Sequence, residues 1–187
     1  MAFYKKTRHF IAFIVTLFLV TLLFYYSYQV FMTSAYPLKY EKDIVRSSQK
    51  YKIDKYLLLA IIREESRFKK NSVSKKGAIG LMQLMPKTAT WISSERSLPY
   101  KKEKLYNPDI NIDYGTWYFN YLIRKYKSKD IALAAYNSGT KIMDEWLAKH
   151  PDKNLNNFVY SETRVFVGKV NKTYKVYKKL YPASTFK

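Results

Sequence analysis

Cysteine is absent from this 187-residue sequence, and histidine is scarce. Without cysteine the chain forms no disulfide and offers no thiol nucleophile and no thiolate ligand for zinc. The two histidines are His9, before a long apolar run, and His150, before Pro151. Neither position favours a role in a Ser-His-Asp triad or in a histidine metal site. We therefore expect neither a metal ion nor a cofactor.

Acidic residues are also few, 14 against 34 lysines and arginines, which gives a formal net charge of +20. Three of the cations precede residue 10, so the rest of the chain carries 31 cations against all 14 acids, a net charge of +17. Such a field concentrates polyanions. Nucleic acid is not the expected partner, because the cations are mostly scattered lysines without a zinc-ligand spacing, an arginine-rich helix or an RNA-binding aromatic motif. Anionic wall polymers or a membrane surface fit better, and a solvated basic surface without a specific partner is the open alternative.

A stretch without any charged residue runs from Phe10 to Phe31. About 20 apolar residues suffice to cross a bilayer as a helix, and the three cations just before the stretch favour a cytoplasmic N-terminus. We expect a single-pass signal anchor in the cell membrane with the following domain on the extracytoplasmic side. The alternative is a signal peptide cleaved near 33–35, which would release a secreted domain. The expected segments are a basic flank, the anchor, a linker and a globular domain: 1–9, 10–31, 32–39 and 40–187.

Helical spacing of apolar residues dominates the exported part, and capping residues mark several helix ends. We predict that Asp54, Asp109 and Asp130 begin helices and that Gly139 ends one. The predicted helices cover residues 39–52, 54–68, 86–92, 109 to at least 123, 130–137, a short segment through 146, and 161–181. Residues 69–80 and 93–108 are expected to form loops. Because no internal repeat and no convincing strand pair is present, the predicted fold is a single all-α domain.

Glu65 is a carboxylate on the apolar face of the predicted helix 54–68. At about 100° per residue it falls within roughly 10–20° of the centre of that face, whereas Glu64 lies at its margin. Tyr56, Arg63 and Arg67 are predicted on the opposite side. The apolar face consists of Leu57, Leu58, Ile61, Ile62 and Phe68. Burial there is expected to raise the pKa of Glu65 and keep its proton near neutral pH, as a general acid requires.

The sequence offers little to serve as a second carboxylate near Glu65. Glycoside hydrolysis usually needs one, as a nucleophile or as a base, but no Asp or Glu lies between Ser66 and Ser94. Asp109, Asp113 and Glu162 are the open candidates, although the first two also suit the start of a helix. The pattern therefore favours a mechanism in which Glu65 acts first as the acid and then as the base.

Three segments, with two shorter pieces in the expected order, closely resemble the motif series of the soluble lytic transglycosylase family. The segments are Glu65-Ser66-Arg67-Phe68, Gly80-Leu81-Met82-Gln83-Leu84-Met85-Pro86 and Ala135-Tyr136-Asn137-Ser138-Gly139, and the pieces are Asn107-Pro108 with Asn111-Ile112 and Glu162-Thr163-Arg164. The resemblance covers about residues 40–180. It implies a single lysozyme-like helical domain, α+β at most, that acts on peptidoglycan glycan strands. The implied reaction cleaves the β-1,4 bond between N-acetylmuramic acid and N-acetylglucosamine and leaves a 1,6-anhydromuramyl end.

By position in these motifs, the resemblance implies that Glu65 is the catalytic acid and base. It also implies that six residues line the substrate cleft, with the tyrosine beside the catalytic glutamate: Ser74, Gln83, Met85, Tyr136, Asn137 and Glu162. The residue types leave other roles open, since Met85 and Tyr136 also suit a core and Asn137 suits a helix C-terminus. Gln83, between apolar residues, favours a hydrogen-bonding role. Phe166 departs from the family, which commonly has tyrosine at that position.

Other functions are compatible with parts of the sequence. A muramidase of the same fold would use Asp109, Asp113 or Glu162 to activate water. A non-catalytic module for glycan binding or scaffolding would not need the carboxyl of Glu65. A membrane-tethered nucleic-acid binder would show steeply salt-dependent affinity for DNA, but the expected topology argues against it.

Overall fold

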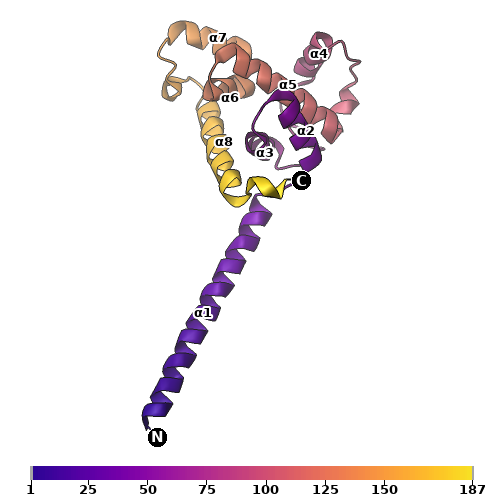
Figure 1. Ribbon diagram of the computed structural model, residues 1–187. Helices are drawn as coiled ribbons and strands as arrows, with labels where there is room; N and C mark the ends of the chain where they lie inside the picture. Colours follow the sequence, from indigo (N-terminus) through magenta and orange to yellow (C-terminus); the bar gives the residue numbers. More distant parts are fainter. Residues whose placement is uncertain (1, 187) are drawn as a thin grey trace. The chain divides into compact units, whose positions relative to one another are not determined.

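The computed structural model describes residues 2–186, with side chains from residue 7 onward, and divides into two compact units, 1–38 and 39–187. The first unit is dominated by one helix, α1 (Ala2–Ala35) (Figure 1). Its segment Thr7–Ala35 has a mean hydropathy of 2.3 and is long and apolar enough to cross a membrane. The helix therefore extends past the predicted apolar stretch at both ends. The side chains of Lys5 and Lys6 lie outside the described part of the chain.

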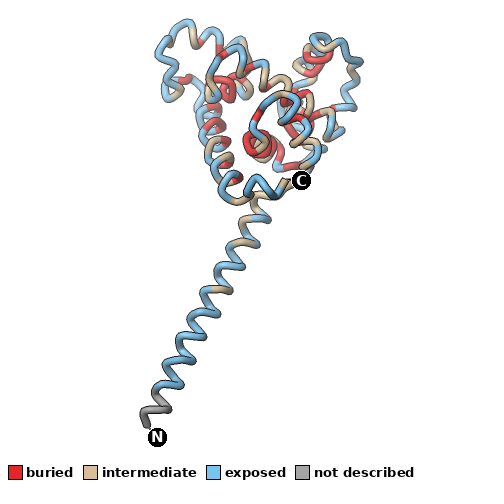
Figure 2. The backbone as a smooth tube through the Cα atoms, viewed as in Figure 1, coloured by how far each residue is buried: buried red, intermediate tan, exposed pale blue. Residues whose placement is uncertain are grey.

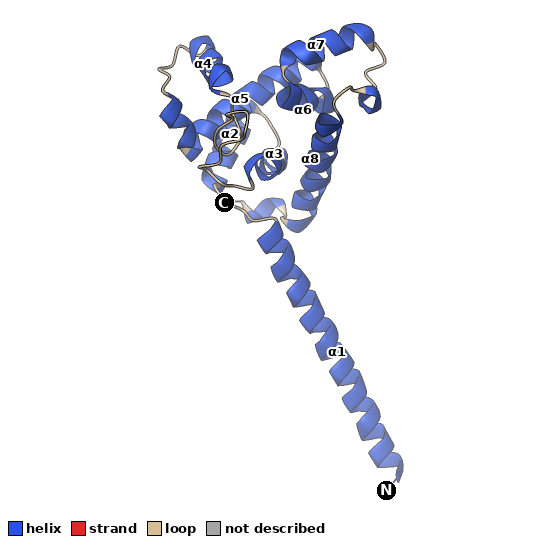
Figure 3. Cartoon of the chain, turned by 180° about the vertical axis from the view of Figure 1, so that it is seen from behind, coloured by secondary structure: helices blue, strands red, loops and turns tan. Residues whose placement is uncertain are grey.

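The second unit is helical, as predicted. It consists of α2 (Glu41–Tyr51), α3 (Lys55–Ser66), α4 (Pro86–Glu95), α5 (Pro108–Tyr126), α6 (Lys129–Ser138), α7 (Thr140–Lys149) and α8 (Ser161–Leu180), with short 3-10 turns at Lys102–Tyr106, Leu155–Asn157 and Ala183–Thr185. Between residues 2 and 186 no strand is formed (Figure 3). The only β-type pairing there is two isolated bridges, which join Ile79 to Val73 and to Leu84. This confirms the all-α fold class.

Helix α3 forms the centre of the domain and packs against α8 and α2 (Figure 2). Every residue of 56–62 is buried, so the helix is covered on all sides rather than along one face. The prediction that Tyr56 lies on a polar side is therefore wrong. Its ring is 8 % exposed, and its hydroxyl donates to the carbonyl oxygen of Tyr181 at 2.7 Å. The C-terminal segment of the chain covers the side that the periodicity left open.

Two of the predicted helix ends are confirmed by their capping geometry. The side chain of Asp54 accepts a hydrogen bond from the backbone N–H of Tyr56 at 2.9 Å and so begins α3. Gly139 follows α6 with a φ of 92°, a conformation that glycine adopts without strain. These caps fix the ends of the helices that carry Glu65 and Tyr136.

Two other helices are capped two residues before the aspartate that was predicted to begin them. Asn107, not Asp109, caps α5, because its side chain accepts from the N–H of Ile110 at 3.4 Å. Ser128, not Asp130, caps α6 through the N–H of Ile131, also at 3.4 Å. Both aspartates lie in the first helical turn, where a carboxylate favours the helix dipole without capping the backbone.

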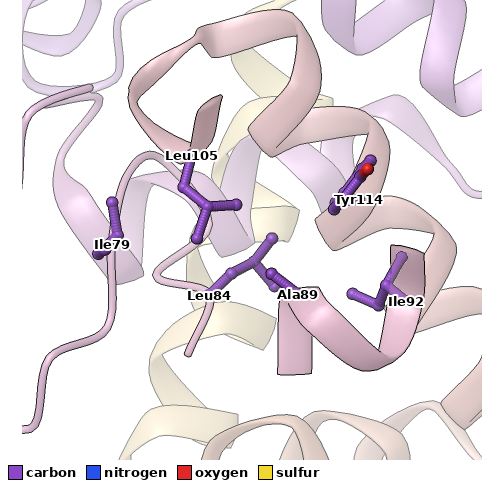
Figure 4. Close-up of a cluster of buried hydrophobic side chains, with 6 residues drawn as sticks. All are labelled: Ile79, Leu84, Ala89, Ile92, Leu105 and Tyr114. Carbon is purple, nitrogen blue, oxygen red and sulfur yellow. The ribbon is translucent and has the colours of Figure 1, made fainter. Parts of the chain in front are cut away.

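A small core joins the loop after α3 to α4 and α5. Its buried members converge from the loop, from both helices and from the 3-10 turn before α5 (Figure 4): Ile79, Leu84, Ala89, Ile92, Leu105 and Tyr114. The predicted loop 93–108 is shorter than expected, since α4 continues to Glu95 and a 3-10 turn covers Lys102–Tyr106. The packing holds the loop 67–85 against the helices, and this loop carries three of the predicted site residues.

Helix α8 begins at the predicted residue and ends one residue early. Phe166, Val170 and Tyr177 are buried, whereas Tyr174 is half-buried and donates its hydroxyl to Asp54 Oδ2 at 2.7 Å. Phe166 is 8 % exposed and packs into the core. The aromatic ring at this position serves the packing of α8.

Candidate active site

A cleft of about 750 Å³ opens beside the C-terminal end of α3. Its walls come from the loop 67–85, from α4, α5, α6 and α7, and from the first turn of α8. All seven residues predicted for the site line this one cleft: Glu65, Ser74, Gln83, Met85, Tyr136, Asn137 and Glu162. Residues separated by almost 100 positions in the sequence are therefore brought together.

Glu65 contributes the cleft's central carboxyl group. Burial raises the pKa of this carboxyl from 4.5 to about 8, and the neighbouring Glu64 adds to the effect. Among the described residues, the Glu65 side chain has no hydrogen bond and no ion pair. Burial without a partner disfavours the charged form, so the group is protonated at neutral pH. Its proton is available to a bound molecule.

Glu64, the adjacent carboxylate, has the opposite environment. Its Oε1 accepts from Arg63 Nη1 at 2.7 Å and from Thr173 Oγ1 of α8 at 2.7 Å. It does not line the cleft. Glu64 therefore ties α3 to α8 through these bonds, and it contributes to the raised pKa of Glu65.

Tyr136 lines the cleft and supports the loop that faces it. Its hydroxyl donates to the backbone carbonyl of Met82 at 2.7 Å, and the N–H of the same residue donates to Asn111 Oδ1 at 2.7 Å. Asn111 is fully buried, and its Nδ2 donates to the carbonyl oxygens of Ile79 at 3.0 Å and Leu105 at 2.8 Å. Burial, with the nearby Glu65, raises the pKa of Tyr136 well above its usual value. The hydroxyl therefore stays protonated and acts as a hydrogen-bond donor.

Gln83 stabilises the turn on which it lies. Its φ of 48° is in the left-handed region, which costs energy for a residue with a side chain. Its Nε2 donates to the carbonyl oxygens of Gly80 at 2.8 Å and Ser72 at 3.2 Å. The expected hydrogen-bonding role is confirmed for the amide nitrogen. The amide oxygen has no protein partner within residues 2–186 and remains available in the cleft.

Ser74 and Met85 lie before and after this turn in the loop 67–85. Ser74 Oγ accepts from the N–H of Ala78 at 3.0 Å and closes a turn beside the cleft. Met85 is 40 % exposed, so it is not core filler, whereas Met82 is fully buried. Of the two methionines of the motif, Met82 therefore packs in the core and Met85 lies at the cleft surface.

Asn137 and Thr163 join α6 to α8 at the cleft. Thr163 Oγ1 donates to Asn137 Oδ1 at 2.8 Å, which explains why this asparagine lies near the end of α6. Gly139, not Asn137, closes the C-terminus of that helix. Glu162 lies in the first turn of α8 and is exposed to solvent.

Asp113 belongs to an ion network outside the cleft. It accepts from Lys50 Nζ at 2.8 Å and from the Tyr51 hydroxyl at 2.7 Å, and it pairs with Arg96 at 2.6 Å. Burial opposes ionisation, but these partners outweigh it and hold the pKa of Asp113 below its usual range. The residue is therefore a structural anion.

Asp109 pairs with Arg46 and also lies outside the cleft. Of the three acids expected as partners for Glu65, only Glu162 lines the same cleft. The expectation that Asp109 or Asp113 approaches Glu65 is therefore wrong. Within the described residues no group of three or more His, Asp and Glu side chains could hold a metal ion.

Sequence reasoning missed several residues that line the cleft. They are Lys75, Lys76, Ala78, Leu84, Thr88, Tyr118, Ser138, Gly139, Ile142, Tyr160 and Thr163. Some of them adjoin or belong to the recognised motifs, so the motif flanks carried a usable signal. Thr88, Tyr118 and Ile142 lie on helices whose approach to the cleft depends on tertiary packing, and no local pattern marks them.

Replacing Tyr136 by phenylalanine is expected to destabilise the domain by about 1–3 kcal/mol, because the buried carbonyl of Met82 loses its donor. Thermal unfolding of the full chain measures the change. Tyr118→Phe is the matched control: Tyr118 lines the same cleft, and its hydroxyl has no partner among the described residues, so a change within about 0.5 kcal/mol is expected. Equal effects of the two variants would contradict the assigned hydrogen bond.

A family model described as "Transglycosylase SLT domain" matches residues 43–159. The chain is 33 % identical over 143 residues to the soluble lytic murein transglycosylase of Escherichia coli, covering 72 % of this chain and 22 % of that protein. It is 33 % identical over 131 residues to the membrane-bound lytic murein transglycosylase E of Buchnera aphidicola, covering 64 % and 59 %. The chain thus spans less than a quarter of the length of the soluble relative.

Two solved structures share the fold. The 70 kDa soluble lytic transglycosylase from Escherichia coli aligns with a TM-score of 0.73 at 29 % identity, over 83 % of this chain and 28 % of that chain. The lytic transglycosylase Slt from Pseudomonas aeruginosa aligns with a TM-score of 0.69 at 26 % identity, over 81 % and 27 %. The latter structure is of an inactive mutant in which a glutamate is replaced by glutamine.

Proposed function

The chain belongs to the transglycosylase SLT domain family, and from this premise we propose that it is a peptidoglycan lytic transglycosylase. The proposed reaction cleaves the β-1,4 bond between N-acetylmuramic acid and N-acetylglucosamine and leaves a 1,6-anhydromuramyl end. The observation that carries the proposal is the unpaired Glu65 carboxyl, with its raised pKa, in a cleft of about 750 Å³. The inactive glutamate-to-glutamine mutant of the Pseudomonas aeruginosa relative supports a catalytic role for a glutamate.

In the proposed first step, Glu65 transfers its proton to the glycosidic oxygen as the bond from that oxygen to the anomeric carbon breaks. The raised pKa keeps the carboxyl protonated before the step, as general acid catalysis requires. Positive charge develops at the anomeric carbon and is met by the substrate's own N-acetyl group. No second protein carboxylate is needed for this step.

In the second step, the Glu65 carboxylate takes the proton of the muramyl 6-hydroxyl while that oxygen bonds to the anomeric carbon. Glu65 ends the cycle protonated, and no water is consumed. The nucleophile belongs to the same sugar, so its effective concentration is high. One residue, Glu65, can therefore perform both the acid step and the base step.

The other residues of the cleft are proposed to hold the glycan strand. The free amide oxygen of Gln83 and the side chain of Ser74 suit the hydroxyl and amide groups of the sugars, and Met85 offers an apolar surface. The hydroxyl of Tyr136 is committed to Met82, so its ring and its support of the loop are its proposed contributions. Asn137 is proposed to contact the strand near α8, where Glu162 would orient it.

We also propose that α1 anchors the protein in the cell membrane, with the cytoplasmic end before residue 10 and the cleft on the extracytoplasmic side. Thr7–Ala35 has the required length, and Tyr25, Tyr26 and Tyr28 lie toward the end of the apolar run, as is typical of a membrane interface. One similar protein is named membrane-bound. Cleavage of the segment would instead release the domain, and anionic wall polymers remain proposed partners of its basic surface.

Mass analysis of digested peptidoglycan tests the proposed chemistry. Intramolecular attack yields muropeptides that are lighter by one water than the reducing ends made by hydrolysis. Hydrolysis is the second candidate, because Glu162 lines the same cleft and offers a carboxylate to activate water. We expect the anhydro products; predominantly reducing ends, abolished by Glu162→Gln, would establish the muramidase instead.

The rate of cleavage is expected to fall as the pH rises through about 8. The sign follows from the direction of the shift, because a carboxyl whose pKa is raised to about 8 loses its proton, and with it the general acid, above that pH. An initial-rate profile of kcat/KM between pH 5 and 9.5, at constant ionic strength, measures this limb. A rate that stays constant up to pH 9.5 would contradict the role of Glu65 as the acid.

A further inference from the structure

The exposed face of α8 carries cations along most of its length. The six cations, all exposed, are Arg164, Lys169, Lys172, Lys175, Lys178 and Lys179, and we call them the α8 cationic face. Glu162, in the first turn, is the helix's only acid. The residues that α8 buries, such as Phe166, Val170 and Thr173, lie on the opposite side of the helix. The cations therefore follow the helical period of the solvent side, over about 15 residues or roughly 20 Å.

The protein's own acids do not neutralise this face. Elsewhere in the described residues seven cations have an acid within 4 Å, but none of them belongs to α8. Three acids beside α8 are engaged by its polar residues: Glu64 accepts from Thr173 and Asp54 accepts from Tyr174, each at 2.7 Å, and Asp130 accepts from Asn171 at 3.0 Å. Lys129 and Lys178 approach the Tyr174 ring to 5.5 and 5.4 Å, which adds a further cation to this end.

The form of the face favours a surface rather than a discrete ligand. In α8, only residues of the first turn line the cleft of about 750 Å³. No residue of α8 lines the second cavity, of about 500 Å³. Five of the six cations are lysines, whose long flexible stems adapt to charges that are spread over a plane. A planar array of phosphates matches such a row better than a single bound anion does.

We infer that the α8 cationic face binds the anionic phospholipid headgroups of the membrane in which the protein is anchored. This inference rests on the proposed anchor. Five residues connect α1 to α2, and five extended residues span at most about 18 Å, so the tether keeps a domain of charge +17 near the bilayer. Over such distances a negative surface attracts basic groups, and each lysine adds to the attraction.

This contact would give the cleft a fixed orientation. The first turn of α8 contributes Glu162 and Thr163 to the cleft, whereas the second half of the helix carries Lys172, Lys175 and Lys179. The helix is rigid, so its cationic face against the headgroups would fix which side of the domain turns toward the bilayer and, with it, the direction in which the cleft opens. The enzyme would then act on glycan strands at a set height above the bilayer.

The absence of cysteine allows a direct test with a single reactive probe. Gly168→Cys places the probe within the cationic face, and a side chain added there meets nothing within 4 Å. Ser94→Cys places the control probe on an exposed position of α4, which lies on the other side of the domain (Figures 1 and 3). The full chain, labelled with a fluorophore, is reconstituted into vesicles of phosphatidylcholine alone or with phosphatidylglycerol. A quencher carried on the lipid headgroups reports proximity.

We expect quenching at Gly168→Cys to rise several-fold with phosphatidylglycerol and to return toward the phosphatidylcholine value in 0.5 M salt. At Ser94→Cys no such rise is expected. Reversal of three cations, Lys172→Glu with Lys175→Glu and Lys179→Glu, is expected to weaken the lipid-dependent quenching about ten-fold or more. Reversal of Lys101, Lys102 and Lys104, which changes the net charge equally on exposed positions at the 3-10 turn that packs against α5, is expected to leave most of it.

Each of three results would overturn the inference: equal quenching at both probes, equal effects of the two triple reversals, or no dependence on phosphatidylglycerol. Added soluble polyphosphate that protects the Gly168→Cys probe from a water-soluble quencher, while phosphatidylglycerol does not, would assign the face to a polymer and also overturn it. Flotation of the unlabelled chain with both vesicle types tests separately whether α1 anchors the protein in the membrane. Failure to float at all would contradict the proposed anchor, and the product analysis tests the catalytic proposal independently.

Discussion

Glu65→Gln is expected to lower the rate of peptidoglycan cleavage by about 10³-fold or more while leaving the domain folded. General acid–base catalysis contributes about 10²–10⁴-fold for one proton transfer, and Glu65 is proposed to perform two. Glutamine keeps the shape of the side chain but carries no transferable proton. Release of anhydromuropeptides from purified sacculi, measured for equal amounts of folded enzyme, gives the ratio.

Glu64→Gln is the matched control, since the two glutamates are adjacent on α3. Glu64 pairs with Arg63 and accepts from Thr173 but does not line the cleft. We expect this variant to lose stability and to keep cleavage within about ten-fold, with the alkaline limb of its pH profile moved to lower pH, because a charge that raises the pKa of Glu65 is gone. If Glu65→Gln cleaved sacculi as fast as the wild type, the enzymatic proposal would fail and a binding module would be the better description.

Glu65→Gln is also expected to stabilise the protein at alkaline pH. In the unfolded chain Glu65 ionises near its usual pKa of 4.5, whereas in the folded protein it keeps its proton up to about 8. The folded state binds the extra proton between these values, so the stability of the wild type falls as the pH rises through this window. Glutamine does not titrate, and its relative advantage at pH 8 should be on the order of 3 kcal/mol. Urea unfolding at pH 5 and pH 8 measures the difference, and an advantage that does not grow with pH would contradict the raised pKa.

Much of the fold could be predicted because the decisive signals are local. Asp54 and Gly139 cap helices through bonds to residues within four positions, and the stripe of α8 follows the helical period. The errors arise where a contact with another residue or segment determines burial or capping. Tyr56 is buried because the C-terminal segment covers it, and Asp130 yields the cap to Ser128, whose side chain reaches the free N–H of Ile131. The periodicity of a single helix carries no information about the C-terminal segment that covers Tyr56 or about the side chain of Ser128.

The residues that line the cleft could be named for a similar reason, whereas their roles stay predictions. The motifs are short, and six of the seven residues lie within them, so these six could be named without knowing how the motifs meet. Ser74 lies between two motifs. The sequence did not indicate the partners that hold them: Asn111 binds Met82 from 29 positions away, and Thr173 reaches Glu64 across 109. Those bonds depend on the packing of α5 and α8, which no local pattern specifies.

Gly80→Ala is expected to be the most destabilising single-methyl change in the cleft loop, at about 3 kcal/mol or more. A Cβ at this position would lie 2.2 Å from Asn111 Nδ2 and 2.4 Å from the carbonyl oxygen of Leu105. Both atoms belong to the buried bonds that hold the loop beneath Gln83, so neither can move without breaking them. A positive φ of 83° adds backbone strain.

Gly77→Ala separates the two contributions, because Gly77 has nearly the same φ, 86°, in the same loop but nothing within 4 Å of its added Cβ. Gly77→Ala should lower the free energy of unfolding only by the strain of a left-handed backbone at alanine, about 1 kcal/mol. The difference between the two variants in thermal or urea unfolding then measures the contact of the loop with Asn111 and Leu105. Equal losses would mean that backbone strain alone matters at both positions and that the bond network around Asn111 can relax. A larger loss for Gly80→Ala, accompanied by a fall in kcat without a matching rise in KM, would show that the network holds the cleft loop in its reactive position.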